Sequence, residues 1–203
     1  MEQVNCDVSP LKAEMKEQLN AISSAIEQSV LALENENGCL LGTFDQIRSR
    51  FSHLETVAAS FYLQCYLGPY TDKYADLSLA VQNLSSRRQG ALIVVERDEP
   101  IGALLQAGIP IGAWMTHSLL ESIFYPGSPL HDGAVVIRES HIVSAANVLP
   151  LSHVEVGEQK LGTRHRAALG LSEQCDALVI VVSEETGKAS FALKGHMYPI
   201  ITH

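Results

Sequence analysis

Apolar residues recur at intervals of three and four over two long stretches near the start of the chain. This spacing places the apolar side chains along one face of a helix. A serine and a proline at residues 9–10 form a typical helix start. The first stretch holds Leu11, Met15, Leu19, Ile22, Ile26, Val30 and Leu33, and the second holds Phe44, Ile47, Phe51, Leu54, Ala58, Phe61 and Cys65.

The segment from Asn35 to Gly38 separates the two stretches and contains residues that end helices. The pattern therefore predicts a helical hairpin. A hairpin alone buries only one side of each helix, so the rest of each stripe needs another partner. Packing on the main domain, self-association and covering of a functional site are all compatible with this pattern.

The pattern changes beyond a hinge predicted at residues 66–74, which contains a Gly-Pro pair. Short β-branched apolar runs alternate there with short helical segments, and some runs are close enough to form hairpins. Strands are expected at 90–95, 109–114, 134–137, 141–148, 178–182 and 189–193, with helices at 76–88, 118–124 and 167–174. We therefore predict an α/β fold with a mixed central sheet flanked by helices, preceded by a two-helix hairpin. The expected domains are residues 1–67 and 68–203.

Composition and charge narrow the class of protein. The formal net charge is −9, which argues against non-specific binding to nucleic acid or to an anionic membrane. The chain has no apolar run long enough to span a membrane and no signal-peptide pattern at its start, so a cytoplasmic protein is expected. The four cysteines are widely spaced, and we expect them to be reduced thiols. P-loop and Rossmann glycine fingerprints and zinc-ligand spacings are absent from the sequence.

The first polar motif is His131-Asp132-Gly133-Ala134, directly before a predicted strand. Such a turn presents a carboxylate at a strand edge, where a glycine lets a ligand approach the backbone. The carboxylate of Asp132 is suited to hold a divalent cation or to accept a proton from a hydroxyl. An Asp-Gly pair is also one of the commonest turn signals, so this motif alone does not establish a function.

The second polar motif is Gly162-Thr163-Arg164-His165-Arg166, which precedes a predicted helix. If the helix starts near Arg166, its free N–H groups and the two guanidinium groups face the same space, which suits phosphate. The alternative is a solvated basic turn. Together, a carboxylate turn and a cationic cluster are typical of metal-assisted phosphoryl chemistry and favour a nucleotide-handling enzyme.

Two further segments follow predicted strands. Ser183-Glu184-Glu185 places carboxylates just past a strand end, where they can join a metal site or be ordinary turn residues. Leu149-Pro150-Leu151-Ser152 can offer backbone groups to a base or simply be a strand exit. The spacing alone leaves both pairs of alternatives open.

Taken together, the segments 127–134, 149–152, 162–168 and 182–187 resemble those of the diadenylate cyclase domain, in the same order along the chain. The likeness extends over about residues 70–200, and the DGA and RHR elements are its most specific part. The N-terminal helical segment without membrane spans is similar to the soluble, sporulation-associated class of this family. The resemblance implies a reaction in which two ATP condense to cyclic di-AMP and release two pyrophosphates.

The resemblance also implies roles for residues. Asp132 would bind the divalent metal, Mn²⁺ or Mg²⁺, and activate the ribose 3′-hydroxyl, and Arg164, His165 and Arg166 would complete the catalytic set. The ATP-binding residues would be Gly133, Ala134, Leu149 through its backbone, Thr163, Arg164, His165, Arg166 and Ser183, and the metal ligands would be His131, Asp132, Glu184 and Glu185.

The implied reaction requires two catalytic domains face to face, each holding one ATP, so a homo-oligomer is expected. A dimer of catalytic domains satisfies this requirement, and a hexamer can contain such dimers. The N-terminal hairpin would then restrain activity by fixing the arrangement of the domains. Two alternatives are a non-catalytic sensor of the same fold that binds ATP or cyclic di-AMP, and a helical oligomerisation protein whose α/β part is a scaffold.

Overall fold

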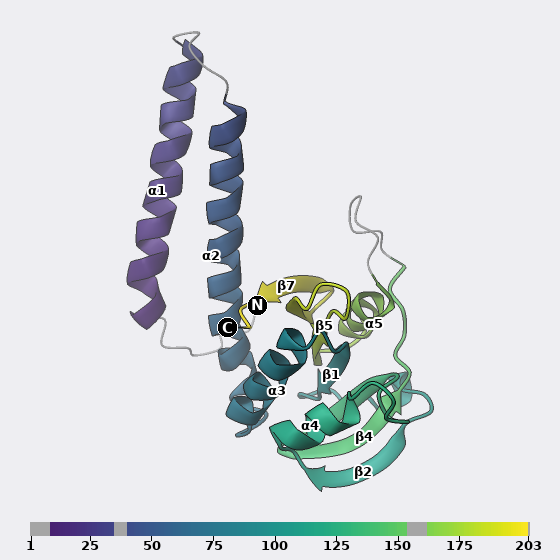
Figure 1. Cartoon of the computed structure of the whole chain (residues 1–203). Coiled ribbons are helices and arrows are strands. Elements are labelled where there is room, and N and C mark those ends of the chain that lie inside the picture. Colours follow the sequence, from purple (N-terminus) through teal and green to yellow (C-terminus); the bar gives the residue numbers. More distant parts are fainter. Residues whose placement is uncertain (1–8, 35–39, 154–161, 203) are drawn as a thin grey trace.

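The computed structural model describes residues 9–34, 40–153 and 162–202. Two long helices, α1 (Ser9–Glu34) and α2 (Leu41–Leu67), lie side by side as an antiparallel pair that extends away from the rest of the chain (Figure 1). Only the second half of α2 reaches the α/β part, where it packs beside the edge strand β7 (His196–Ile200). The predicted helical pair is thus confirmed, while its predicted turn at 35–38 lies outside the described residues.

The α/β part is built on a seven-stranded mixed sheet with the order β2-β4-β3-β1-β5-β6-β7. Strands β1 and β3 are parallel, and every other neighbouring pair is antiparallel. The remaining strands are β1 (Ala91–Val95), β2 (Ile109–Trp114), β3 (Ala134–Arg138), β4 (His141–Asn147), β5 (Leu178–Val182) and β6 (Ala189–Leu193). The predicted α/β class with a mixed sheet is confirmed.

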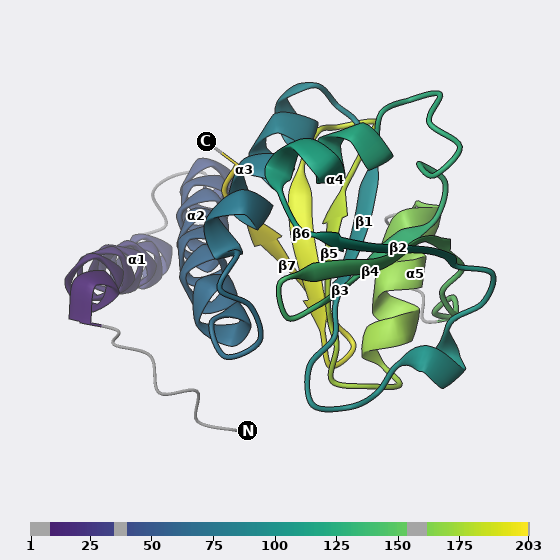
Figure 2. The same cartoon turned by 90° about the horizontal axis from the view of Figure 1, so that it is seen from below.

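Helices cover both faces of this sheet (Figure 2). Helices α3 (Tyr74–Ser86) and α4 (His117–Ile123) lie on one face, and α5 (Thr163–Ser172) lies on the other. Alternate strand residues therefore enter two separate cores, so that Ile93 packs with α3 and α4 while Val94 packs with α5. Because both faces are covered, the residues of β1 and β5 are buried without alternation. A short 3₁₀ turn, Gly102–Leu104, follows β1.

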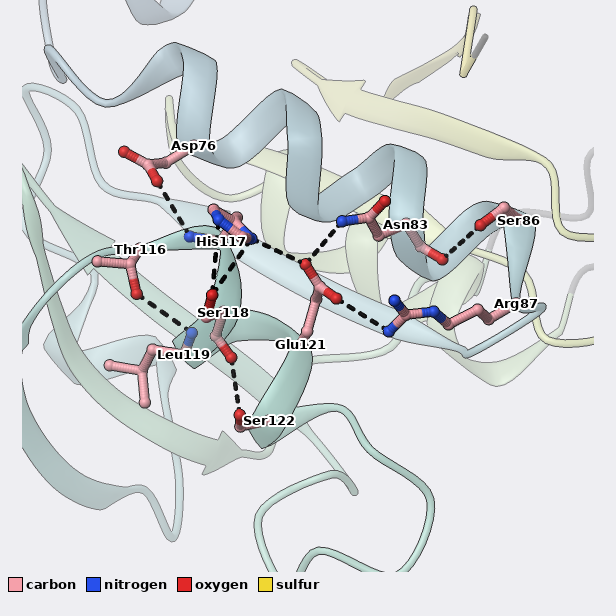
Figure 3. Close-up of polar contacts among 10 residues, drawn as sticks. All are labelled: Asp76, Asn83, Ser86, Arg87, Thr116, His117, Ser118, Leu119, Glu121 and Ser122. Carbon is pink, nitrogen blue, oxygen red and sulfur yellow. Dashed lines mark hydrogen bonds and ion pairs between the residues drawn. The ribbon is translucent and has the colours of Figure 1, made fainter.

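Helices α3 and α4 are joined by a polar network centred on Glu121 (Figure 3). Its carboxylate accepts hydrogen bonds from Asn83 Nδ2 at 2.8 Å and Arg87 Nη1 at 2.9 Å, both on the α3 side. Glu121 also lies 3.1 Å from His117 Nδ1 on its own helix. The hydrogen bond from Asn83 is the largest cause of a lowered pKa of the Glu121 carboxyl, and the contact with His117 and the charge of Arg87 add to it, while burial opposes it. The carboxylate therefore remains charged within this network.

Several expectations need correction. The helix expected at 167–174 begins at Thr163, so the Thr-Arg-His-Arg segment forms its first turn. Residues 66 and 67 belong to α2 rather than to a hinge. Strand β7 was not expected, and it contains Pro199, which is tolerated because β7 is an edge strand. Cys175 is a free thiol, but Cys65 is disulfide-bonded, so the expectation of reduced thiols is wrong for Cys65.

A large part of the apolar surface of the hairpin remains exposed. The exposed large apolar residues of α1 and α2 are Leu19, Ile26, Val30, Leu31, Leu33, Leu41, Phe44, Phe51 and Tyr62. We call this set the hairpin stripe. In the described parts of the chain, no helix combines the length and the apolar character that crossing a bilayer requires.

Candidate active site

Four of the predicted segments meet at one edge of the sheet. Because β3 runs parallel to β1 while β4 and β5 run antiparallel to their neighbours, the starts of β1 and β3 lie at the same edge as the ends of β4 and β5. The Asp132 turn precedes β3, Leu149 follows β4, and Glu184 follows β5. We call this the nucleotide edge. It brings together segments that are spread over about fifty residues of the sequence.

The turn before β3 is shaped by Gly133 and Asn147. Gly133 has φ of +112°, and a Cβ there would lie 2.8 Å from the carbonyl carbon of Ala146, so only glycine fits. The buried Asn147 at the end of β4 donates from Nδ2 to the Ala134 carbonyl at 2.8 Å. Asp132 itself is exposed. The backbone of the turn is therefore fixed by its contacts with β4, while the Asp132 carboxylate is exposed to solvent.

His131 has a structural contact of its own in this turn. Its Nδ1 lies within hydrogen-bonding distance of the Ser128 carbonyl, which can only accept, so Nδ1 carries the proton. In the neutral ring, the other nitrogen, Nε2, is then an acceptor. As a metal ligand, His131 would have to use Nε2.

The N-terminus of α5 presents the cationic motif. Gly162 is the N-cap residue with extended backbone, and Thr163, Arg164 and His165 are the first three helical positions. The N–H groups of these positions have no acceptor within the helix, and the helix dipole adds positive potential. A helix that starts at Thr163 suits phosphate better than one that starts near Arg166, as predicted, because the whole motif then lies at the N-cap and in the first turn.

Arg164 reaches across the edge to the end of β5. Its Nη1 lies 2.8 Å from Glu184 Oε2, and this ion pair sits directly over Gly90, the residue before β1. A Cβ at Gly90 would lie 2.6 Å from Arg164 Nη1 and 3.0 Å from Glu184 Oε2. Gly90 therefore makes room for the pair, a role that no local motif in the sequence indicated.

The next two residues of the motif, His165 and Arg166, differ in burial. Burial lowers the pKa of His165, and the neighbouring Arg164 adds to this effect, while Glu185 opposes it. A neutral His165 can donate one hydrogen bond to a phosphate oxygen without adding charge. Arg166 is exposed, and its Nε donates to the Ser152 carbonyl at 3.3 Å.

The segment after β4 crosses over α5. The Leu149 side chain is buried with Ala167 and Ala168, so any contact from Leu149 to a nucleotide comes from its backbone. Further along, Ser152 N donates to the Arg166 carbonyl at 2.9 Å. The segment after β4 is thus hydrogen-bonded to the first turn of α5.

The predicted metal ligands do not form one cluster. His131 and Asp132 lie on the β3 side of β1, whereas Glu184 and Glu185 lie on the β5 side, with Glu184 paired to Arg164. Over the described ranges, no three His, Cys, Asp or Glu side chains gather closely enough to hold a metal ion.

Comparisons with known proteins agree with this architecture. Residues 78–197 match the DAC family model, described as DisA bacterial checkpoint controller nucleotide-binding, and residues 2–70 match a model for the N-terminal part of the diadenylate cyclase CdaS. The diadenylate cyclase CdaS of Bacillus thuringiensis (strain BMB171) is 49% identical over 190 residues, covering 94% of each chain. The cyclic di-AMP synthase CdaS of Bacillus subtilis (strain 168) is 51% identical over 170 residues, covering 84% of this chain and 82% of the relative.

A solved structure is also similar over nearly the whole chain. A crystal structure from Bacillus cereus, described as a hypothetical membrane spanning protein, has a TM-score of 0.76 and 48% identity and covers 95% of both chains. These matches extend over the hairpin as well as the sheet. The chain therefore belongs to the diadenylate cyclase family and, within it, to the CdaS group.

Proposed function

We propose that this protein is a diadenylate cyclase that condenses two ATP into cyclic di-AMP and releases two pyrophosphates. The observation that supports this most directly is the nucleotide edge. There an exposed carboxylate before β3 lies beside the start of β1, and Arg164 from the N-terminal turn of α5 lies over Gly90, the residue before β1. A proton acceptor and a phosphate site on one edge are what a nucleotidyl transfer requires.

In this mechanism the residues divide between binding and proton transfer. The first-turn N–H groups of α5, with Thr163 and Arg164, bind the phosphates of one ATP, and His165 donates a further hydrogen bond. Asp132 accepts the proton of a ribose 3′-hydroxyl, whose oxygen attacks the α-phosphorus of the other ATP. The bond from that phosphorus to the bridging oxygen breaks, and pyrophosphate leaves.

The donor set fits a divalent cation that arrives with ATP better than a preformed metal centre. Mg²⁺ and similar ions are commonly held by one or two carboxylates together with substrate phosphates and water. Asp132 and Glu185 are exposed carboxylates of this kind, whereas Glu184 is occupied by Arg164. We propose Mn²⁺ or Mg²⁺, held mainly by Asp132, with His131 and Glu185 as further ligands, whereas Glu184, also predicted as a ligand, would first have to release Arg164. When bound, the cation neutralises the charge that develops on the phosphate oxygens.

One chain provides half of the reaction. Each 3′-oxygen must lie in line with the pyrophosphate leaving the other ATP, so two nucleotide edges must face each other. We propose a homo-oligomer that contains such dimers, with a hexamer as one arrangement that does so. By its class, we also propose that the protein acts in the cytoplasm during sporulation.

The first experiment is product identification. Purified full-length protein incubated with ATP and Mn²⁺ is expected to yield cyclic di-AMP and pyrophosphate, identified by mass spectrometry. The same incubation without a divalent cation is expected to leave ATP unchanged. Bound ATP without any product under all divalent-cation conditions would favour the sensor of the same fold, and absence of ATP binding would favour the scaffold alternative.

We further propose that residues 1–67 form a regulatory and oligomerisation unit that restrains residues 68–203. The hairpin stripe supports this, because a monomer that exposes this many large apolar residues on one pair of helices has an incomplete interface. Val30 and Phe51 are 52% and 55% exposed, although both lie on the predicted apolar faces. A second copy of the hairpin would cover them.

Polar substitution of the stripe tests this restraint. Val30→Ser combined with Phe51→Ser is expected to lower the assembly mass measured by light scattering and to raise the rate of cyclic di-AMP formation several-fold. Gln64→Ser, at an exposed polar position of α2, is the control and should change neither quantity. An unchanged rate in a smaller assembly would refute restraint by the hairpin.

A further inference from the structure

Ser85, near the end of α3, joins two segments that are far apart in the sequence. Its Oγ donates to the Gly187 carbonyl at 2.6 Å and lies 3.0 Å from Thr202 Oγ1. A hydroxyl has one proton, and a carbonyl can only accept, so the Thr202 hydroxyl is the donor of the second bond. Ser85 therefore connects the turn after β5 with the segment after β7.

The first of these connections reaches the nucleotide edge. Gly187 N donates to the Ser183 carbonyl at 2.9 Å, which closes the turn that contains Glu184. Gly187 has φ of +74°, and a Cβ there would lie 2.8 Å from the Ser85 carbonyl oxygen. The turn is thus in direct contact with the end of α3, so a displacement of Ser85 changes the position of the turn.

The second connection reaches the hairpin. Next to Thr202, Ile201 N donates to Ser60 Oγ at 2.8 Å, and Ser60 Oγ in turn donates to the Thr56 carbonyl on α2. The segment after β7 is therefore hydrogen-bonded to α2 through Ile201 and to α3 through Thr202. Two adjacent residues link the hairpin to Ser85.

The junction between these helices contains a small cavity. A cavity of about 60 Å³ lies between α2, α3 and the segment after β7, and Ser60, Val81 and Thr202 are among its lining residues. The packing between α2 and α3 is therefore incomplete at this point, although Leu63 and Leu67 of α2 are buried in the core that α3 shares. The hydrogen bonds therefore act together with the apolar packing of Leu63 and Leu67 in setting the relative position of the hairpin.

We propose that Ser85 is a positioning residue for the Ser183–Gly187 turn and that Ile201 and Thr202 transmit the position of the hairpin to it. This inference rests on the proposed cyclase activity for its kinetic consequences but not for its structural ones. The route runs from Ser60 through Ile201 and Thr202 to Ser85 and Gly187, and so to the residues around Arg164. A hairpin held in a different position in the assembly would alter ATP binding along this route.

Single substitutions test the positioning role. Ser85→Ala leaves the buried Gly187 carbonyl without its donor and is expected to raise the KM for ATP about five-fold, the equivalent of one hydrogen bond, with a smaller effect on kcat. Ser85→Thr keeps the hydroxyl and should restore the KM. Ser86→Ala is the matched control, since Ser86 Oγ donates to the Asn83 carbonyl within α3. Equal effects of Ser85→Ala and Ser86→Ala would overturn the proposal.

A double-mutant cycle in the full chain tests transmission. Ser60→Ala is expected to change the KM for ATP on its own. In the Ser85→Ala background, the change in ln KM caused by Ser60→Ala should be less than half as large. The same fold-change in both backgrounds, or no effect of Ser60→Ala alone, would overturn the proposal. Hydrogen exchange at the Gly187 amide gives a readout independent of turnover, and Ser60→Ala should accelerate it. If the wild-type chain made no cyclic di-AMP, the proposed function would fail while this exchange measurement would still test the connection.

Discussion

Replacing Asp132 by Asn is expected to lower the rate of cyclic di-AMP formation by about a thousand-fold or more, because this side chain is both the proposed proton acceptor and the main proposed cation ligand. An amide cannot take the proton of the 3′-hydroxyl, and it is a poor ligand for a divalent cation. The substitution is nearly isosteric, and Asp132 is exposed, so the turn before β3 should keep its shape. Affinity for ATP in the absence of a divalent cation, measured by calorimetry, should change little because the phosphates are bound by α5.

The matched control is Asp98→Asn. Asp98 is also an exposed carboxylate but follows the opposite end of β1, where it accepts a hydrogen bond from the Tyr70 hydroxyl at 2.6 Å. An asparagine oxygen can accept the same bond, so activity should be unchanged. Loss of less than ten-fold in the Asp132 variant would show that the proton acceptor lies elsewhere.

Gly170→Ala is expected to destabilise the fold by about 2–3 kcal/mol, the reverse of the usual effect of this change in a helix. Gly170 lies within α5, where alanine is normally the better helix former. A Cβ there, however, would lie 2.5 Å from Ser152 N and 2.6 Å from the carbonyl carbon of Leu151. These are backbone atoms, so either α5 or the segment after β4 must move. Urea unfolding followed by circular dichroism measures the loss.

Gly42→Ala on α2 supplies the comparison. Among the described residues, no heavy atom outside the neighbouring backbone of α2 lies within 4 Å of a Cβ at Gly42, so this variant should be as stable as the wild type or more stable by up to about 1 kcal/mol. Equal changes of the same sign in both variants would mean that the segment after β4 does not pack against α5 in solution. Because the same segment bonds to the Arg166 carbonyl, the Gly170 variant should also bind ATP less tightly.

Much of the fold was predictable because its signals are local. The three- and four-residue spacing in α1 and α2 and the apolar runs of β1 and β5 each specify their own element. Strand β7 lacked such a signal, since it contains Pro199 and only Ile200 is fully buried. The start of α5 was placed too late because Arg164 and His165 are polar, and polar residues in a first turn resemble a loop when read without the N-cap geometry.

The site was predictable only in part for a related reason. Asp132 and Arg164 belong to motifs that are contiguous in sequence, so their chemistry could be read directly. Gly90 acts through contacts with Arg164 and Glu184, which are far along the chain, and its only signal was a glycine before a buried strand. Asn147 acts through a hydrogen bond to Ala134 on the neighbouring strand, which depends on the pairing of β3 with β4. Ser85 likewise has no motif, because its partners lie more than a hundred residues away.

The ion pair over Gly90 has a consequence for how ATP is admitted. Arg164 already has an anionic partner, so a triphosphate that binds it replaces an internal counterion instead of filling a vacant positive site. Only ligands that gain several contacts at once can drive this exchange, since one phosphate oxygen merely matches what Glu184 provides. We therefore expect the edge to bind orthophosphate and other small anions more weakly than ATP, and ATP affinity to depend on ionic strength less steeply than it would with an unpaired arginine.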